Sequence, residues 1–400
     1  MHAEICKWYG GADSPVLFMI DDLANTWVDA NQNGTLDPGE DWGYFRNEEN
    51  SSFAFLNEKI LKEFPELKVT FFVPVGTRAG MLRDSLFPQT SKPINSDEES
   101  KRFFRSIHQH PKFELAYHGT THGTPGARAA DFVQEWAGFG SVEEAVGTIE
   151  RGIEIYRDAV GDSPRGGKYC GYISNDYSDE SIDETGFAWW CRYWNRGVPE
   201  GEKDVGTGQD RDPRTNFDVK RFGRSKVLDI PSTVNGELLK GICKNDPSVK
   251  GAIKRLIRKP LIRWKLRQID YLIKHRLVIS VQEHIAPSRD DGKRQTPNIW
   301  DDLESLMGIF HYLRNKNVWY CTGSELADYV NLRDHVKMVF EDQDTFTLKH
   351  TALDAKRFIS LKFKERGRLQ ILLPNRMSVG VKEGVANLPL MRGKYTIIRC

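Results

Sequence analysis

The stretch Val16-Leu17-Phe18-Met19-Ile20-Asp21-Asp22 decides the fold, because five apolar residues run directly into two adjacent carboxylates. A continuous apolar run of this length predicts a strand that is buried on both faces, as in a parallel sheet. Ligands and catalytic groups of parallel α/β folds gather at the carboxyl ends of the strands. Since burying unpaired charge is costly, Asp21 and Asp22 either serve a site at this end or cap the next segment and face water.

The composition indicates a globular protein of two domains, or one barrel with an appendage. The chain has 400 residues, of which 39% are hydrophobic and 28% charged, with a formal net charge of +1. This balance gives no reason to expect a polyanionic partner. The six cysteines contain no C-x-x-C pair, which favours reduced thiols. The sequence shows neither the apolar core of a signal peptide nor a membrane-spanning run, so we expect a cytoplasmic protein.

Residues 29–40 fit the pattern of an EF-hand calcium loop without a gap. Calcium requires six to eight hard oxygen ligands, which alternate residues of a tight loop can supply. The expected ligands are the side chains of Asp29, Asn31 and Asn33, the backbone carbonyl of Thr35, Asp37 directly or through water, and both oxygens of Glu40. The alternative is an ordinary polar loop, since Asn, Asp and Gly are common turn residues.

The rest of the first 335 residues alternates expected helices and strands, which predicts a parallel α/β architecture. Helices are expected at 53–64, 97–110, 141–160 and 300–317. Strands are expected at 67–74, 113–117, 186–194, 227–231, 277–284 and 318–321. From residue 336 the apolar period changes to two, which predicts a small antiparallel β-sandwich over 336–400. This second domain either binds glycan or covers the barrel, and we favour the second.

Histidines also follow two of the expected strands. His118-x-x-x-His122 comes directly after the strand at 113–117, and His284 ends the strand at 277–284, with Glu283 beside it. Two histidines and one carboxylate, with a position left for water, form a standard catalytic zinc set. The alternative for His118 and His122 is a pair of exposed loop residues.

Three further segments carry candidate functional residues. The glycine-rich stretch 163–172 contains Arg165 and Lys168 but lacks the spacing of a phosphate loop, so it can also be a simple turn. Trp189, Trp190 and Trp194 either belong to the core or stack on a sugar. The basic stretch 244–276 is a solvated helix face, or a cradle for a diphosphate-linked or membrane-surface substrate. It lacks the interleaved aromatic residues typical of nucleic-acid binding.

Together, the segments Met19–Asp22, His118–His122 and Leu277–His284 resemble the polysaccharide deacetylase family (NodB homology, carbohydrate esterase 4) in order and strand context. The resemblance covers roughly residues 14–330. It implies a distorted (β/α)7 barrel with a divalent metal, usually zinc.

The same resemblance implies the roles of individual residues. Asp22, His118 and His122 would hold the metal, Asp21 would be the base and His284 the acid. The chain departs from the family at three points: Leu23 replaces a glycine, Gly123 replaces a proline, and the R-x-P-Y motif is not intact. Either Arg165 or Lys168 would stand in for the arginine of that motif.

We therefore expect a barrel over residues 1–335, with a calcium-loop insertion at 29–40 and a basic insertion at about 195–275, followed by the β-sandwich at 336–400. The expected function is metal-dependent removal of an acetyl group from an N-acetylated sugar. That sugar belongs to a polysaccharide or to its nucleotide- or lipid-linked precursor, and contact with a membrane surface fits the second case. The alternatives are a glycan-binding barrel without catalysis, and another metal-dependent C–N or glycosidic hydrolase. The oligomeric state stays open.

Overall fold

The structure is a computed structural model that describes residues 3–192, 194, 217–243, 249–351, 354–364 and 368–399, with the backbone alone at 243 and 249–257. Residues 195–216 and 244–248 of the expected basic insertion lie outside the described residues. The chain forms two compact units. One comprises Val16–Lys316 and Tyr320–Ser324, and the other comprises Met1–Pro15, Asn317–Trp319 and Glu325–Cys400.

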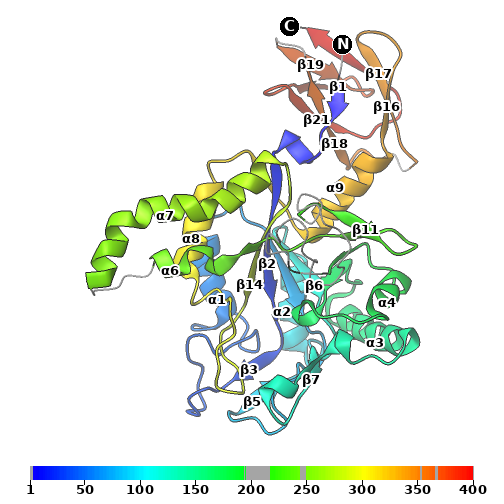
Figure 1. Cartoon of the computed structure of the whole chain (residues 1–400). Helices are drawn as coiled ribbons and strands as arrows, with labels where there is room; N and C mark the ends of the chain where they lie inside the picture. Colours follow the sequence, from blue (N-terminus) through cyan, green and yellow to red (C-terminus); the bar gives the residue numbers. More distant parts are fainter. Residues whose placement is uncertain are drawn as a thin grey trace. The chain divides into compact units, whose positions relative to one another are not determined.

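The larger unit is built on a curled sheet whose strands are almost all parallel (Figure 1). Nine of its described strands follow one path, which runs β11 (Lys220–Phe222), β12 (Val227–Asp229), β10 (Trp189–Cys191), β9 (Gly166–Lys168), β6 (Phe113–Tyr117), β4 (Val69–Val73), β2 (Ser14–Asp21), β14 (Ile279–His284), β13 (Val234–Asn235). Along this path only β11 and β12 pair antiparallel. The unit is therefore a distorted (β/α) barrel, as the sequence predicts.

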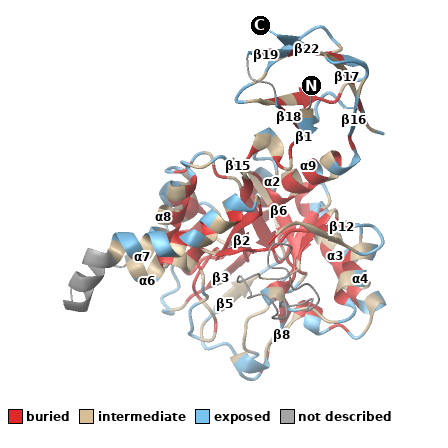
Figure 2. Ribbon diagram, turned by 45° about the horizontal axis from the view of Figure 1, so that its top comes forward, coloured by how far each residue is buried: buried red, intermediate tan, exposed pale blue. Residues whose placement is uncertain are grey.

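The continuous apolar runs explain which strands lie at the centre. Every residue of β2 and of β4 is buried, and Figure 2 shows β2 and β6 largely in red. Helices pack around the sheet: α1 (Ser52–Phe55) continued by η2 (Leu56–Leu61), α2 (Glu98–His108), α3 (Val142–Val160), α4 (Ser178–Glu184), α6 (Lys240–Cys243), α7 (Val249–Lys274) and α8 (Leu303–Leu313). Among the described residues, no helix combines the length and apolar character that a membrane crossing requires.

The glycine-rich segment at 163–172 differs from the simple turn that its composition allows, because Gly166–Lys168 form strand β9 between β6 and β10. Tryptophan rings take the space that side chains would need there. A Cβ on Gly166 would lie 2.0 Å from the Trp189 ring, and one on Gly167 would lie 2.3 Å from the Trp190 ring. The glycines thus allow close packing inside the sheet, and they place Lys168 at a strand end.

Strand register brings the predicted site residues to one edge of the sheet. Asp21 pairs with His284 across β2 and β14, and Tyr117, just before His118, pairs with Gly167, just before Lys168. Because all these strands are parallel, their carboxyl ends meet at the same edge. Four short strands lie in the connections that follow: β3 (Thr26–Val28) pairs with β5 (Gln89–Ser91), and β7 (Gly123–Thr124) pairs with β8 (Val133–Gln134).

The smaller unit is a β-sandwich, as the period of two predicts. One sheet has the order β1 (Ala3–Ile5), β18 (Phe358–Phe363), β21 (Val385–Pro389); the other has the order β16 (Lys337–Phe340), β17 (Thr345–Lys349), β22 (Lys394–Arg399), β19 (Leu369–Leu372), β20 (Ser378–Gly380). Every pairing is antiparallel. The expected boundary at 335 differs from the structure, because Met1–Pro15 and most of α9 (Gly323–His335) also belong to this unit. Strand β1 has only three residues, so its sequence pattern does not indicate that it pairs with β18.

Candidate metal centre and active site

Asp22 is the centre of a cluster of buried polar groups at the end of β2. Its side chain is 1% exposed, and Arg78 donates a hydrogen bond of 2.8 Å to its Oδ2. Its Oδ1 lies 3.2 Å from Nε2 of His122 and 3.7 Å from Nε2 of His118. That oxygen has no hydrogen-bond partner among the described residues. The structure thus brings together the three residues that the resemblance assigns to the metal.

The protonation states of this cluster suit a cation. Burial alone would raise the pKa of Asp22, but Arg78 and the neighbouring histidines lower that pKa below its usual range. Burial lowers the pKa of His118 and brings the pKa of His122 to about 3, so both imidazoles are neutral at physiological pH. Nδ1 of His118 lies 3.0 Å from the carbonyl oxygen of Lys168, which favours the tautomer that leaves an Nε2 lone pair facing Asp22.

Cys170 also lies at this cluster, and the sequence analysis missed it. The possible ligand atoms of His118, His122 and Cys170 all lie within 4.8 Å of one another, and the three side chains are buried. The Cys170 thiol donates to the carbonyl oxygen of His118 at 3.1 Å, and burial raises the pKa of this thiol well above its usual range. A single cysteine without a neighbouring cysteine or histidine in the sequence gives no pattern that would have indicated this position.

Glu135, a second residue that the sequence analysis missed, holds the loop that carries both histidines. Its carboxylate accepts three backbone N–H groups, from Thr120 at 2.9 Å and from Thr121 and His122 at 2.8 Å each. Gly119 has a φ of +86°, and a Cβ there would lie 2.6 Å from Oε2 of Glu135. The glycine and the carboxylate together fix the turn that aims His118 and His122 at Asp22.

Replacing Glu135 with alanine is expected to destabilise the protein by about 3–5 kcal/mol, because three buried N–H groups lose their acceptor. Metal affinity should fall by about 10–100-fold, as is usual for residues that orient ligands. Urea unfolding and metal titration measure the two effects. Glu150→Ala, at an exposed position of α3, is the control and should change neither. A Glu135→Ala protein with unchanged stability would contradict this role.

Asp21 is paired with Lys168. Both carboxylate oxygens accept from Nζ of Lys168, at 2.8 and 2.9 Å, and the lysine is fully buried. The same ammonium group also donates to Oε1 of Gln282 and lies over the rings of Phe72 and Tyr172. Of the two cations considered from the sequence, Lys168 therefore contacts the predicted base. Arg165 is exposed and exerts its electrostatic effect on Glu114.

His284 lies beside Asp21 in the sheet register, with both ring nitrogens engaged. Nδ1 is 2.7 Å from the carbonyl oxygen of Pro297, and Nε2 is 2.8 Å from Nε2 of Gln295. This network indicates a neutral ring with the proton on Nδ1, so that Nε2 accepts from the Gln295 amide. A positive charge on His284 would be close enough to lower the pKa of both Asp22 and His122. Glu283, which the sequence suggested as an orienting group, is fully buried, and neither of its carboxylate oxygens has a hydrogen-bond partner among the described residues.

The expectation that Trp189 or Trp190 contacts a sugar is wrong for this structure. Both side chains are 0% exposed, because they fill the space left by the glycines of β9. Trp189 donates to Ser324, and Trp190 packs among Tyr117, Trp136, Tyr169 and Phe187. Trp194, the third tryptophan considered, is partly exposed, and its ring centroid lies 6.0 Å from that of Tyr172.

The segment 29–40 forms a compact loop stabilised by its own carboxylates. Asp29 accepts from the backbone N–H groups of Asn33 and Gly34 at 3.1 and 2.9 Å, and Glu40 accepts from those of Ala30 and Asp37 at 2.9 and 3.1 Å. Asp29 and Glu40 are 3% and 4% exposed, whereas Asn31, Asn33 and Thr35 are exposed. The side-chain amides of Asn31 and Asn33 donate to Asp37 at 2.5 and 2.7 Å.

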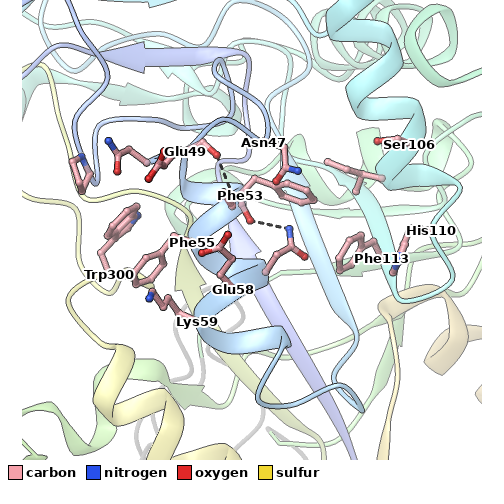
Figure 3. Close-up of a pocket in the computed structure, with 16 residues that line it drawn as sticks. Asn47, Glu49, Phe53, Phe55, Glu58, Lys59, Ser106, His110, Phe113 and Trp300 are labelled. Carbon is pink, nitrogen blue, oxygen red and sulfur yellow. Dashed lines mark hydrogen bonds between the residues drawn. The ribbon is translucent and has the colours of Figure 1, made fainter.

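A separate pocket of about 970 Å³ lies in the same unit and shares no lining residue with the polar cluster around Asp22 (Figure 3). Figure 3 shows Phe55, Trp300 and Lys59 at one side and Phe113 with His110 at the other, with Glu58 between them. Phe113 is the first residue of β6, whose opposite end leads into His118. The pocket therefore lies at the end of β6 that is remote from the polar cluster around Asp22, and it is not part of the candidate site.

Of the three comparisons with known proteins, only the one with solved structures finds similar chains. No protein-family model matches the chain, and no curated protein matches it. A candidate polysaccharide deacetylase from Mycobacterium smegmatis is 17% identical, with a TM-score of 0.45 over 84% of this chain and 96% of that one. Puue allantoinase is 13% identical, with a TM-score of 0.43 over 81% of this chain and 92% of that one. A GH57 branching enzyme from Thermococcus kodakaraensis is 10% identical, with a TM-score of 0.47 over 79% and 71%.

Several more of the aligned structures are polysaccharide deacetylases or proteins of carbohydrate esterase family 4. Their identities to this chain, from 10% to 14%, and their TM-scores, from 0.35 to 0.42, are too low to transfer an activity. The class of the protein is therefore given by its own geometry: a distorted (β/α) barrel with a buried histidine–carboxylate cluster at the carboxyl ends of its strands.

Proposed function

We propose that the protein is a metal-dependent hydrolase that removes the acetyl group from an N-acetylated sugar. The observation that carries this proposal is the approach of Asp22 Oδ1, without a hydrogen-bond partner among the described residues, to Nε2 of His122 and of His118 at 3.2 and 3.7 Å. Two neutral imidazoles and an anionic oxygen are a fitting donor set for zinc or a similar divalent ion. A metal bound here would supply Lewis-acid polarisation of the acetyl carbonyl and would make water more acidic.

The protein groups around this set have distinct roles in amide hydrolysis. Asp21 accepts a proton from the attacking water. Lys168 orients this carboxylate by donating hydrogen bonds to both of its oxygens. His284, on the neighbouring strand, gives a proton to the departing nitrogen, since an amine anion is too basic to leave. For this step His284 must carry a proton on Nε2, so the Gln295 amide that now donates to this atom must turn. The products are acetate and an amino sugar.

The partly exposed Trp194 suggests where the rest of the substrate binds, and helix α7, which leads into the amino end of β14, offers a separate basic surface. Trp194 lies near Tyr172, whose ring contacts the Lys168 ammonium, so a sugar stacked on Trp194 would be near the base. On α7, the ring of Trp264 is 58% exposed, with the cationic Arg263 and Lys265 next to it in sequence. A basic helix with an exposed tryptophan suits a diphosphate-linked substrate at a membrane surface.

A barrel that binds glycan without catalysis is the second candidate, and Arg78 favours it. The Arg78 guanidinium already neutralises Asp22 through the 2.8 Å contact to Oδ2, so a divalent ion would meet a neighbouring positive charge. Such a charge lowers the affinity for metal without blocking Oδ1.

Acetate release separates the two candidates. The purified protein, stripped with chelator and reloaded with zinc, is incubated with oligosaccharides of N-acetylglucosamine, and both acetate and new amine are measured. Equal amounts of the two products, dependent on zinc, support deacetylation. Binding of the same oligosaccharide without either product would leave only the glycan-binding function.

We also propose that the loop at 29–40 binds calcium through the six residues that its pattern assigns. The buried carboxylates of Asp29 and Glu40 and the positive φ of Gly34, +73°, already shape the loop as such a site requires. Coordination needs the amides of Asn31 and Asn33 to turn their oxygens inward.

Saturating calcium is expected to raise the thermal stability of the protein, by about 2.7 kcal/mol at a concentration 100 times the dissociation constant. Replacing Glu40 with glutamine should remove most of this increase, because the bidentate anionic ligand is lost. Differential scanning calorimetry with and without calcium measures it. Asp84→Asn, at an exposed position outside the loop, should respond like the wild type. Equal stabilisation of the Glu40→Gln protein would refute the site.

A further inference from the structure

Cys170 has no role in the reaction proposed above, although it is part of the histidine cluster. The ligand atoms of His118, His122 and Cys170 lie within 4.8 Å of one another. In tetrahedral zinc sites the Zn–N and Zn–S distances, about 2.0–2.1 and 2.3 Å, place neighbouring ligand atoms about 3.3–3.6 Å apart. A modest contraction of the cluster therefore brings the sulfur and both nitrogens to the spacing that one ion requires.

One further atom at this place indicates a bound cation independently of the cysteine. Oδ1 of Asp22 has no hydrogen-bond partner among the described residues, and its side chain is 1% exposed. Buried polar atoms in folded proteins almost always have a partner. Oδ1 is directed at the histidines, as its 3.2 Å distance to Nε2 of His122 shows. A cation among these groups satisfies the carboxylate oxygen that the protein leaves unpaired.

The surroundings of the sulfur also suit a ligand. Cys170 follows Tyr169 directly after β9, and its thiol is held only by a weak S–H bond of 3.1 Å to the carbonyl oxygen of His118 among the contacts described for it. Metal binding replaces the S–H proton, which leaves to solvent, by a metal–sulfur bond.

We propose that Cys170 is a ligand of the metal, together with His118 and His122, and that its thiolate makes the site selective for zinc-like ions. This inference rests on the proposed function only in requiring a metal at the two histidines. Thiolate is a soft ligand that favours zinc or cobalt over magnesium or manganese. Together with Asp22, the protein would supply four ligand groups. Catalytic zinc can expand to five ligands, so the substrate can still bind to the ion.

Cobalt substitution tests the proposal by a readout that needs no activity. The full-length protein is titrated with Co²⁺ and its absorption recorded, because a thiolate ligand adds a near-ultraviolet charge-transfer band that nitrogen and oxygen ligands do not give. The wild type should show this band together with visible d–d bands. Cys170→Ala should lose the near-ultraviolet band and keep the visible bands, with zinc affinity lower by about 10–100-fold or more in competition with a chelator.

Cys191→Ala is the matched control, because Cys191 is equally buried, at the end of β10, but does not belong to the cluster. Cys191→Ala should keep the near-ultraviolet band. If Cys170→Ala does not fold, Cys170→Ser takes its place in the experiment. Visible bands without the near-ultraviolet band in the wild type, or an unchanged band in Cys170→Ala, would overturn the proposal and leave deacetylation standing. The band without any acetate release would remove the proposed function and keep the ligand. A wild type that binds no cobalt would overturn both.

Discussion

Replacing His118 with alanine is expected to reduce zinc-dependent acetate release by about 10³-fold or more, because the metal loses a buried nitrogen ligand and with it the polarisation of the acetyl carbonyl. Bound zinc should fall in parallel, as measured by elemental analysis of the dialysed protein. The fold should persist, since a small cavity replaces one ring whose hydrogen bond goes to a single carbonyl oxygen, that of Lys168.

His110→Ala is the control for this experiment. His110 is an exposed histidine that lines the separate pocket and stacks on Phe113, far along β6 from the cluster. Its loss should leave zinc content and rate close to those of the wild type. If His118→Ala retained both the metal and the rate, the metal centre would have to lie elsewhere.

Replacing Lys168 with methionine is expected to destabilise the protein by about 3–5 kcal/mol, because the Asp21 carboxylate stays buried without its partner. The pair is almost fully shielded, with side-chain exposures of 0% for Lys168 and 4% for Asp21, so solvent does not compensate. Urea unfolding of the variant and of the wild type measures the loss. Adding Asp21→Asn to Lys168→Met should restore much of the stability, because the double variant no longer buries an unpaired carboxylate.

An exposed pair gives the comparison for this prediction. Lys101 and Asp158 are also in contact, at 3.0 Å, but their side chains are 20% and 54% exposed. Lys101→Met should therefore cost less than about 1 kcal/mol. A similar small cost for Lys168→Met would mean that the pair with Asp21 contributes little, and that the base is oriented by other groups.

The parts of the site that could be predicted from the sequence are those that follow continuous apolar strands. β2 and β14 are recognisable because their apolar runs are buried, and in β6 the last three residues, Leu115–Tyr117, are buried as well. The polar residues that follow these strands share one edge of a parallel sheet. Asp22, His118 and His284 could be expected together for this reason. No knowledge of distances was needed, only the rule that parallel strands end on the same side.

Other parts depend on packing that composition hides. Gly166 and Gly167 look like turn residues, but they belong to a strand whose missing side chains are replaced by two tryptophan rings. The same packing buries Trp189 and Trp190, which sequence reasoning could assign equally well to a sugar. The choice between Arg165 and Lys168 depended on the strand as well, since only its end directs a side chain to Asp21.

Arg78, Glu135 and Cys170 reach the cluster from segments without a recognisable pattern. Arg78 lies in the connection after β4, and Glu135 lies in a short 3-10 turn that follows β8. Arg78 contacts a carboxylate, Glu135 accepts from three backbone N–H groups, and the Cys170 thiol donates to the carbonyl oxygen of His118. Such contacts produce no periodic pattern in the sequence. The contact between Arg78 and Asp22, for example, can be recognised only in the folded chain.

The pairing of β1 with β18 has a consequence for biosynthesis. Gly10 donates to Oγ of Ser360 at 2.7 Å, although 350 positions separate the two residues. At about 5–20 residues per second, the ribosome needs about 20–70 s to deliver the second partner after the first. The larger unit can emerge and close during this interval, whereas β1 has no partner in the sandwich until β18 (Phe358–Phe363) has been synthesised. Chaperones that bind nascent chains would meet this strand throughout.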